Sequence, residues 1–159
     1  MNYETDLDDL IMTLVKEGGS DLHITVGHFP TLRINRDLIP LTRKKELTAE
    51  DTLGLLSQMI GEKSLTNFVV TQEIDFSYAH RKEYRLRGNA SFQRGVISIA
   101  LRLIPRVKSL AELNLPDQLI HISRERQGFF LVVGPVGQGK STTLSAMVAL
   151  INSESRRHI

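Results

Sequence analysis

A glycine-rich segment directly after an apolar run constrains this chain more than any other feature. Residues 129–133 are five consecutive apolar residues, and they lead into the pattern Gly134-x-x-x-x-Gly139-Lys140-Ser141, after which an apolar helical pattern begins. This order of strand, loop and helix is the context that a phosphate-binding P-loop requires. The alternative is a glycine-rich turn between a buried strand and a buried helix, and the complete pattern in this context favours the P-loop.

The residue types in the loop explain how it would bind phosphate. Glycine at positions 134, 137 and 139 lets the backbone curl around an anion with several N–H groups aimed at it. The helix that begins near Lys140 adds its free N-terminal amides, and the Lys140 ammonium can reach the β- and γ-phosphates. The Ser141 hydroxyl would bind Mg²⁺, which is usually held by substrate phosphates as well.

The composition excludes several classes of protein. The 159 residues are 41% hydrophobic, which is enough for a core, and the net charge of +2 supports no bulk affinity for nucleic acid. The charge is uneven, because residues 80–108 hold eight Lys or Arg and one acid, Glu83. The absence of cysteine removes disulfides, thiolate metal sites and thiol catalysis. No signal peptide and no apolar run of about 18 residues is visible, so we expect a cytosolic protein.

Hydrophobic periodicity predicts a mixture of helices and strands. Helices are predicted over residues 7–15, 48–60, 62–70 and 117–125, and strands over residues 20–26, 31–35, 74–78, 84–93 and 96–104. In the first strand Leu22, Ile24 and Val26 would face the core. The run Thr48-Ala-Glu-Asp51 looks like a helix-capping signal, and Gly61 should end that helix.

Two of these strands would form an antiparallel hairpin that presents arginines. Arg85 and Arg87 alternate with apolar residues on the first strand, and Arg102 occupies the polar face of the second. On alternation alone, a solvated basic sheet face is the favoured interpretation. The functional alternative is a surface that binds phosphate or nucleic acid, because guanidinium groups bind phosphate with two hydrogen bonds.

The histidines give little indication of a site. His23 could act as a general base, but a solvent-facing strand residue or a partner for Asp21 is the simpler interpretation. The other histidines, at positions 28, 80, 121 and 158, are scattered, without the i, i+4 pair of a helical zinc site. No metal site is predicted from them.

The chain is predicted to hold one domain and the beginning of another. A linker at residues 105–116 would separate residues 1–104 from residues 117–159. The helix after the P-loop should bury one face, formed by Leu144, Met147, Val148 and Ile151. A P-loop strand normally lies in a parallel sheet of several strands, but residues 129–133 are the single candidate here. We therefore expect this chain to be the N-terminal part of a longer protein.

Segments along nearly the whole chain occur in the order seen in a known family. They are residues 19–24, 31–35, 73–77, 84–89, 93–95, 101–105, 109–116 and 134–143. Together they resemble the amino-terminal part of PilT-type ATPases, the type IV pilus retraction motors of the type II/IV secretion ATPase family. The P-loop alone would fit many NTPases, whereas the Ser20-Asp21-Leu22-His23 segment and the upstream Leu115-Pro116 connector are more specific.

The resemblance implies an α/β fold, in which a PAS-like domain with an antiparallel sheet precedes the start of a RecA-like domain. It implies a homo-hexameric ring, ATP and Mg²⁺ as cofactors and nucleotide between the two domains. An inner-membrane pilus platform protein would be the partner, at the cytoplasmic side of that membrane, and no nucleic acid is expected. Residues implied to bind nucleotide are Gly134, Val136, Gly137, Gln138, Gly139, Lys140, Ser141, Thr142, Arg87, Arg94 and Arg102, with Ser141 on the metal.

This chain departs from the family pattern in two ways. The family usually has threonine and serine where the loop has Val136 and Gln138, which leaves binding possible but could change rates. The acidic box, the catalytic glutamate and the histidine box of the family would all follow residue 159. His158 falls about where the strand before the acidic box should begin. We therefore predict that no catalytic residue lies in this chain and that the chain alone hydrolyses ATP negligibly.

Two alternatives remain open. A pilus-extension or type II secretion ATPase shares the C-terminal domain, although such relatives generally carry a longer N-terminal region. A non-catalytic module is the other alternative, in which the arginine-rich sheet binds nucleic acid or a partner ATPase. No aromatic residues are interleaved with the arginines on that face, and this disfavours nucleic-acid binding.

Overall fold

The computed structural model describes residues 2–155, so the strand start expected at His158 lies outside the described residues. The chain divides into two compact units, Met1–Pro105 and Arg106–Ile159. The first unit contains α1 (Tyr3–Lys16), β1 (Asp21–Thr25), β2 (Thr31–Ile34), β3 (Asp37–Pro40), α2 (Ala49–Thr71), β4 (Glu73–His80), β5 (Tyr84–Gln93) and β6 (Val96–Ile104). The second contains α3 (Gln118–Arg124) and α4 (Lys140–Glu154).

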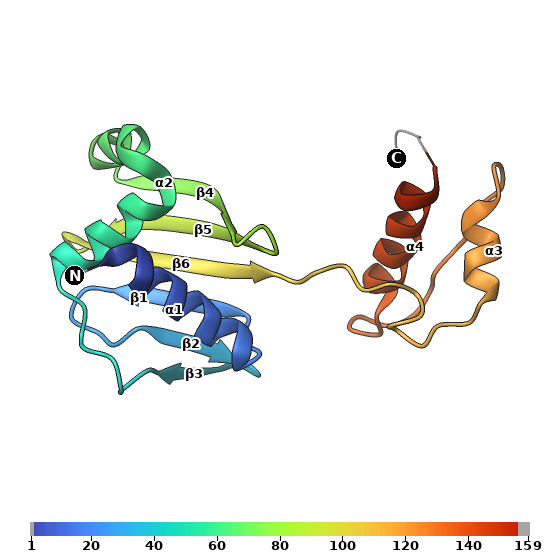
Figure 1. The fold of residues 1–159 in the computed structure, drawn as a ribbon, viewed down its shortest axis with the longest axis horizontal. Coiled ribbons are helices and arrows are strands. Elements are labelled where there is room, and N and C mark those ends of the chain that lie inside the picture. The colour runs from blue at the N-terminus through green and yellow to red at the C-terminus, as the bar shows by residue number, and fades with distance from the viewer. Residues whose placement is uncertain (1, 156–159) are drawn as a thin grey trace. The chain divides into compact units, whose positions relative to one another are not determined.

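One antiparallel sheet organises the first unit. Its six strands lie in the order β3-β2-β1-β6-β5-β4, and every neighbouring pair is antiparallel. Helices α1 and α2 both cover the same face of this sheet (Figure 1). The α/β fold class and the antiparallel sheet expected from the sequence are therefore confirmed.

The core lies between the two helices and the covered face of the sheet. Its most buried side chains are Leu7, Ile11, Leu14, Leu22, Ile24, Leu32, Leu56, Phe68, Leu86, Ile99 and Leu101. Burial alternates along most of β5 and β6, which leaves a mainly polar face on the other side of the sheet. In β1, Leu22 and Ile24 face the core, and Asp21 is buried on the polar side. Val26, which was expected in the core, lies just beyond β1 and is half-buried.

The edge strand β3 was not predicted. Asn35 and Arg36 connect it to β2, and both have positive φ, 50° and 79°. A two-residue turn with this backbone matches the twist of paired strands and usually carries Asn-Gly. Arg36 stands where glycine is usual, so the turn could not be recognised in the sequence. Leu38 and Ile39 are consecutive apolar residues and both are exposed, so β3 lacks the alternation of apolar and polar residues that indicates a strand.

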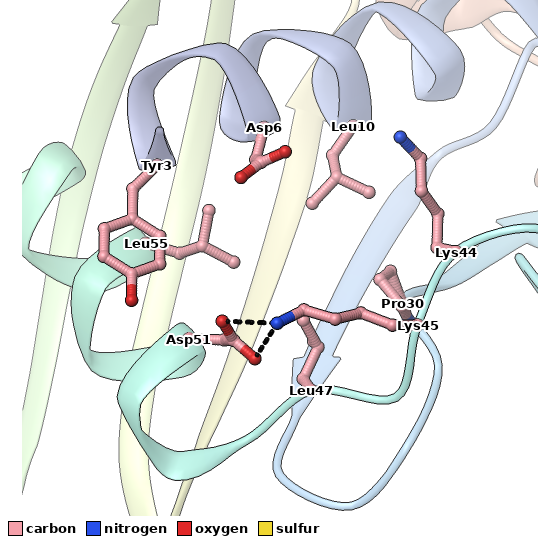
Figure 2. Close-up of a pocket in the computed structure, with 9 residues that line it drawn as sticks. All are labelled: Tyr3, Asp6, Leu10, Pro30, Lys44, Lys45, Leu47, Asp51 and Leu55. Atoms are coloured by element: carbon pink, nitrogen blue, oxygen red, sulfur yellow. Dashed lines mark hydrogen bonds and ion pairs between the residues drawn. The ribbon is translucent and has the colours of Figure 1, made fainter. Parts of the chain in front are cut away.

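Helix α2 begins and bends as its sequence predicts. The Asp51 N–H donates to Thr48 Oγ1 at 3.2 Å, and the Thr48 N–H donates to Asp51 Oδ2 at 2.9 Å, which completes a capping box. The Lys45 ammonium lies 2.9 Å from the same carboxylate (Figure 2). At Gly61 the backbone leaves helical geometry, with φ 73° and ψ 164°, so two helical segments meet at a kink.

The second unit has a small core of its own. Leu110, Ala146 and Met147 are buried together, and partly buried leucines and an isoleucine pack around them. Leu110 belongs to a helical turn closed by Ser109 and Glu112, whose side chains each accept the other's N–H, at 2.8 and 3.2 Å. The assignment of a linker to residues 105–116 stays a prediction. None of the helices in residues 2–155 is long and apolar enough to cross a membrane.

Two sequence predictions for the second unit were wrong. Residues 129–133 do not form a strand, and Phe129 and Val133 are 87% and 82% exposed. A strand needs a neighbour that pairs with its backbone, and no strand is present in the described part of this unit. On α4, Leu144 and Val148 are exposed, whereas Met147 is buried, because only one side of the helix meets the small core.

Removal of the α2 cap tests the local energetics. Thr48→Ala should lower the free energy of unfolding by about 1 kcal/mol, because the Asp51 amide loses its acceptor. Urea denaturation followed by circular dichroism measures this change. Thr66→Ala is the control, since this exposed hydroxyl only bonds the Glu62 carbonyl within α2, and it should change stability by less than about 0.5 kcal/mol. Equal losses for the two variants would contradict the capping role.

Candidate functional site

The predicted P-loop is exposed from residue 134 to residue 139 and leads directly into α4. Gly137 and Gly139 have φ of 86° and 84°, in the region that favours glycine. A Cβ at either position would meet nothing within 4 Å, so the loop needs glycine for its backbone conformation rather than for space. Gly139 is the N-cap of α4 and offers no side chain to its amides, which leaves them available for an anion.

The reactive side chains of the loop gather at the N-terminal end of α4. Lys140 folds back over the loop, and its Nζ donates to the Pro135 carbonyl at 2.7 Å. Ser141 and Thr142 are exposed in the first turn of the helix. Gly134, Val136 and Gln138 lie in the loop itself, also exposed. A phosphate chain in this cradle would replace the Pro135 carbonyl as the partner of the ammonium.

The residues present fit Mg²⁺ only together with a bound phosphate. Among residues 2–155, no group of three or more His, Asp or Glu side chains could hold a metal ion. Mg²⁺ prefers water and phosphate oxygens, with one or two oxygen ligands from the protein. The exposed Ser141 hydroxyl could supply one such ligand once a nucleotide is in place.

The polar face of the sheet in the first unit carries a row of charged residues across four strands. In register, Arg87 on β5 faces Arg102 on β6, which faces Asp21 on β1, which faces Arg33 on β2. We call Arg87, Arg102, Asp21 and Arg33 the charged row. A pocket of about 260 Å³ lies over part of it. Its lining residues are Asp21, Asp75, Arg87, Gly88, Asn89, Ala100 and Arg102.

Asp21 is the centre of the hydrogen bonding in this row. Its side chain is 9% exposed, and its Oδ1 accepts a hydrogen bond from Arg102 Nε at 2.8 Å. Its Oδ2 accepts from the Ser20 hydroxyl at 2.7 Å and lies 3.5 Å from Arg33 Nε. Burial raises the pKa of Asp21, but the bonds from Ser20 and Arg102 outweigh this and hold the pKa below its usual value.

The structure separates the three arginines that the sequence grouped together. Arg87 and Arg102 lie side by side in the charged row. Arg94 is in the turn between β5 and β6, with φ 54°, seven residues beyond Arg87. With a rise of about 3.4 Å per residue, this turn is roughly 20 Å away along the hairpin. Arg94 therefore does not share a pocket with the other two.

His23 lies on the same sheet face as Asp21, one row further along. Burial lowers its pKa, and the nearby charges of Arg33 and Arg102 lower it more, against the opposing effect of Asp21. Its Nε2 is buried and has no hydrogen-bond partner within residues 2–155. The imidazole is therefore neutral at physiological pH, and no hydrogen bond joins it to Asp21 in the described part of the chain.

Sequence reasoning missed several residues of this pocket. Asn89 and Asp75 line it but were not proposed as site residues. Asn89 donates from Nδ2 to Asp75 Oδ1 at 3.3 Å and, outside the pocket lining, to Glu73 Oε1 at 3.2 Å. The alternation does put Asn89 on the same face as Arg87. The register between strands, which brings Asp75 and Ala100 beside it, could not be read from the sequence.

A second, smaller cavity of about 40 Å³ opens between α1, the start of α2 and residues 41–47 (Figure 2). It is lined by Tyr3, Asp6, Leu10, Pro30, Lys44, Lys45, Leu47, Asp51 and Leu55. The Lys45 ammonium forms an ion pair with the Asp51 carboxylate that caps α2. This cavity has room for little more than water and shares no residue with the P-loop, and it shares none with the charged row.

The chain is similar to known proteins along nearly its whole length. Residues 3–159 match the family described as type II/IV secretion system protein. The type IV pilus ATPase PilU of Pseudomonas aeruginosa is 34% identical over 155 residues, 97% of this chain and 40% of PilU. The type IV pilus retraction ATPase PilT of the same organism is 32% identical over 159 residues, 97% of this chain and 45% of PilT. The chain thus spans less than half of these relatives.

Solved structures of two ATPases superpose on most of this chain. A crystal structure of the pilus retraction motor PilT with bound ADP superposes with a TM-score of 0.72 and 35% identity, over 91% of this chain and 43% of that one. The ATPase DotB of Legionella pneumophila superposes with a TM-score of 0.69 and 27% identity, over 91% of this chain and 41% of DotB.

The lowered pKa of Asp21 predicts a specific dependence of stability on pH. A depressed carboxyl pKa stabilises the fold above the usual value near 4, and this stabilisation is lost as pH falls through the folded-state pKa. At pH 7, Asp21→Asn should cost ~2 kcal/mol through lost charged hydrogen bonds. Urea denaturation between pH 7 and pH 2 should show that the difference in unfolding free energy between the wild type and Asp21→Asn becomes smaller below about pH 4. A gap independent of pH would contradict the assignment.

Proposed function

Because the chain belongs to the type II/IV secretion system protein family, we propose that it is the nucleotide-binding part of a motor ATPase. The observation that carries this proposal is the P-loop at the N-terminal end of α4. There Lys140 and Ser141 stand beside free helix amides, and Gly137 and Gly139 have the conformation that such a loop needs. The PilT relative whose crystal structure contains ADP supports nucleotide as the ligand.

The proposed cofactors are ATP and Mg²⁺. Lys140 would contact the β- and γ-phosphates, and Ser141 would share Mg²⁺ with them. Gly134, Val136, Gly137, Gln138, Gly139 and Thr142 are the other proposed loop contacts. Arg87 and Arg102 of the first unit, which lie side by side, are further proposed phosphate ligands, because a guanidinium binds phosphate with two hydrogen bonds. Arg94 is also proposed, but from its place in the β5–β6 turn it would have to make a separate contact.

We propose that ATP hydrolysis by the whole protein drives pilus retraction. Similarity to PilU and PilT supports this choice. Similarity to a type II secretion system protein E of Aeromonas hydrophila supports the second candidate, a type II secretion or pilus-extension ATPase. For the pilus motor we propose a homo-hexamer on the cytoplasmic side of the inner membrane that acts on a pilus platform protein.

ATP turnover tests the proposed enzyme class. The protein expressed from its native reading frame should hydrolyse ATP, and Lys140→Ala should reduce turnover at least about tenfold by removing a charged phosphate contact. Lys108→Ala, an exposed lysine in the same unit, is the matched control and should leave turnover unchanged. The 159-residue chain alone should show negligible turnover. Turnover that is insensitive to Lys140→Ala would overturn the proposal.

The direction of force needs a test in cells. Deletion of the gene should leave surface pili in place and abolish twitching if the motor retracts pili. Loss of surface pili would instead favour an extension motor, and normal pili with impaired protein export would favour secretion. Electron microscopy of surface pili and a twitching assay distinguish these results.

A further inference from the structure

Strand β4 is a long outer strand of the sheet, and within the described residues one side of its backbone has no partner. It lies at one end of the strand order and pairs with β5 alone (Figure 1). We propose that β4 is a self-pairing edge, along which the first units of two copies of this chain join their sheets in antiparallel orientation, across a two-fold axis at Ser77. The inference does not rest on the proposed function, because no residue of the proposed P-loop takes part.

The hydrogen bonds between β4 and β5 show which backbone groups of β4 point outward. The Phe92 N–H donates to the Gln72 carbonyl at 3.0 Å, at the position that continues the register of the two strands. Hydrogen-bonded positions recur at every second residue along an antiparallel pair. Even-numbered residues of β4 therefore point their backbone groups to β5, and odd-numbered residues point theirs to the open edge.

The outward-pointing groups of β4 define one register for a second copy. The Glu73 carbonyl accepts from the Thr71 hydroxyl at 3.0 Å, which leaves Asp75, Ser77 and Ala79 as the odd-numbered residues without a backbone partner among residues 2–155. An antiparallel second copy with Ser77 opposite its own counterpart puts Asp75 opposite Ala79. All the free N–H and C=O groups of these residues then pair, whereas a shift by two residues in either direction leaves some of them unpaired.

The side chains favour the same register. Arg85 pairs with Ala79 and shares its sheet face, so in the joined sheet Ala79 would lie between Arg85 and Asp75 of the second copy. Two strand spacings, about 10 Å, would separate the backbones of Arg85 and that Asp75, a span that an arginine can bridge over an alanine. On the covered face, Phe76 would lie opposite Tyr78 of the second copy, and aromatic cross-strand pairs stabilise sheets.

One repulsion opposes the contact and is weak. Arg87 pairs with Ser77, so the Arg87 residues of two copies would lie on either side of the paired serines. Three strand spacings put their backbones about 14 Å apart. Exposed charges at this distance are largely screened, because the Debye length at physiological salt is about 8 Å.

The opposite edge of the sheet is protected against such pairing. Strand β3 has 4 residues, and Pro40 has no N–H to donate. Strand β4 has 8 residues with no proline or lysine, and its register with β5 is continuous, without a bulge. The described part of the second unit contains no strand that adds to this edge. An extended segment of another protein is a different occupant, but the symmetry of the free groups about Ser77 favours a second copy.

The test is disulfide trapping with a mild oxidant, in the protein expressed from its native reading frame. Opposite residues at a hydrogen-bonded position have Cα atoms about 5.5 Å apart, a distance that a disulfide spans. Ser77→Cys should therefore link two copies at least about tenfold faster than Ala79→Cys, whose two copies would lie about 14 Å apart along the strands. Peptide mass spectrometry identifies the segment around residue 77 joined to itself, with the wild type as the blank.

Further variants test the register and the charges. A mixture of Asp75→Cys and Ala79→Cys should form the mixed disulfide faster than either variant links to itself, and it decides the question if Ser77→Cys does not fold. In the Ser77→Cys background, Arg85→Glu should slow trapping about two- to tenfold, because two exposed ion pairs are lost. Arg43→Glu, at an exposed arginine in the turn after β3, makes the same change of charge and should leave the rate unchanged.

The possible outcomes separate a specific contact from random collision. Equal rates for Ser77→Cys and Ala79→Cys would mean collision only, and would overturn the inference. Trapping of Ser77→Cys no faster than the wild-type background would also overturn it and leave the edge to an extended segment of another protein. Lys140→Ala should not change trapping at residue 77, so this inference and the proposed function can fail separately.

Discussion

Pairing of strand backbones is the constraint on which both units of this chain depend. In the first unit all six strands find antiparallel partners, and two helices cover one face, so apolar side chains alternate into a closed core. In the second unit, the apolar residues 129–133 have no partner strand within the described residues and remain exposed. The same physical requirement thus produces a complete domain in one half and an unpaired segment in the other.

This difference determines how each candidate site is formed. The proposed P-loop depends on local properties, namely glycines with positive φ and the free amides at the start of α4. It takes its shape although the segment before it is unpaired. The pocket over the charged row depends on sheet register instead, because Asp21 and Arg102 are distant in sequence and meet only through the pairing of β1 with β6.

The same distinction explains how much could be predicted from the sequence. The glycine conformations of the loop before α4, the capping box at Thr48 and the break at Gly61 depend on near neighbours in the sequence, and they could be predicted from it. That the loop binds phosphate stays a prediction. The β2–β3 turn lacked its usual glycine at Arg36 and was missed. The hydrogen bond from Arg102 to Asp21 was missed, because alternation tells which face of the sheet a residue lies on but not which residue of the next strand it is paired with. The buried face of α4 was misjudged because periodicity does not say what the helix packs against.

The central claim, that this chain cradles the phosphates of a nucleotide at the P-loop, is tested most directly by comparing the affinities of ATP, ADP and AMP. The measurement is equilibrium dialysis with the protein expressed from its native reading frame. The loop amides and Lys140 act on the β- and γ-phosphates, so ATP and ADP should bind at least about tenfold more tightly than AMP. Equal affinities for the three nucleotides would mean that the loop does not hold the phosphate chain, and would contradict the claim.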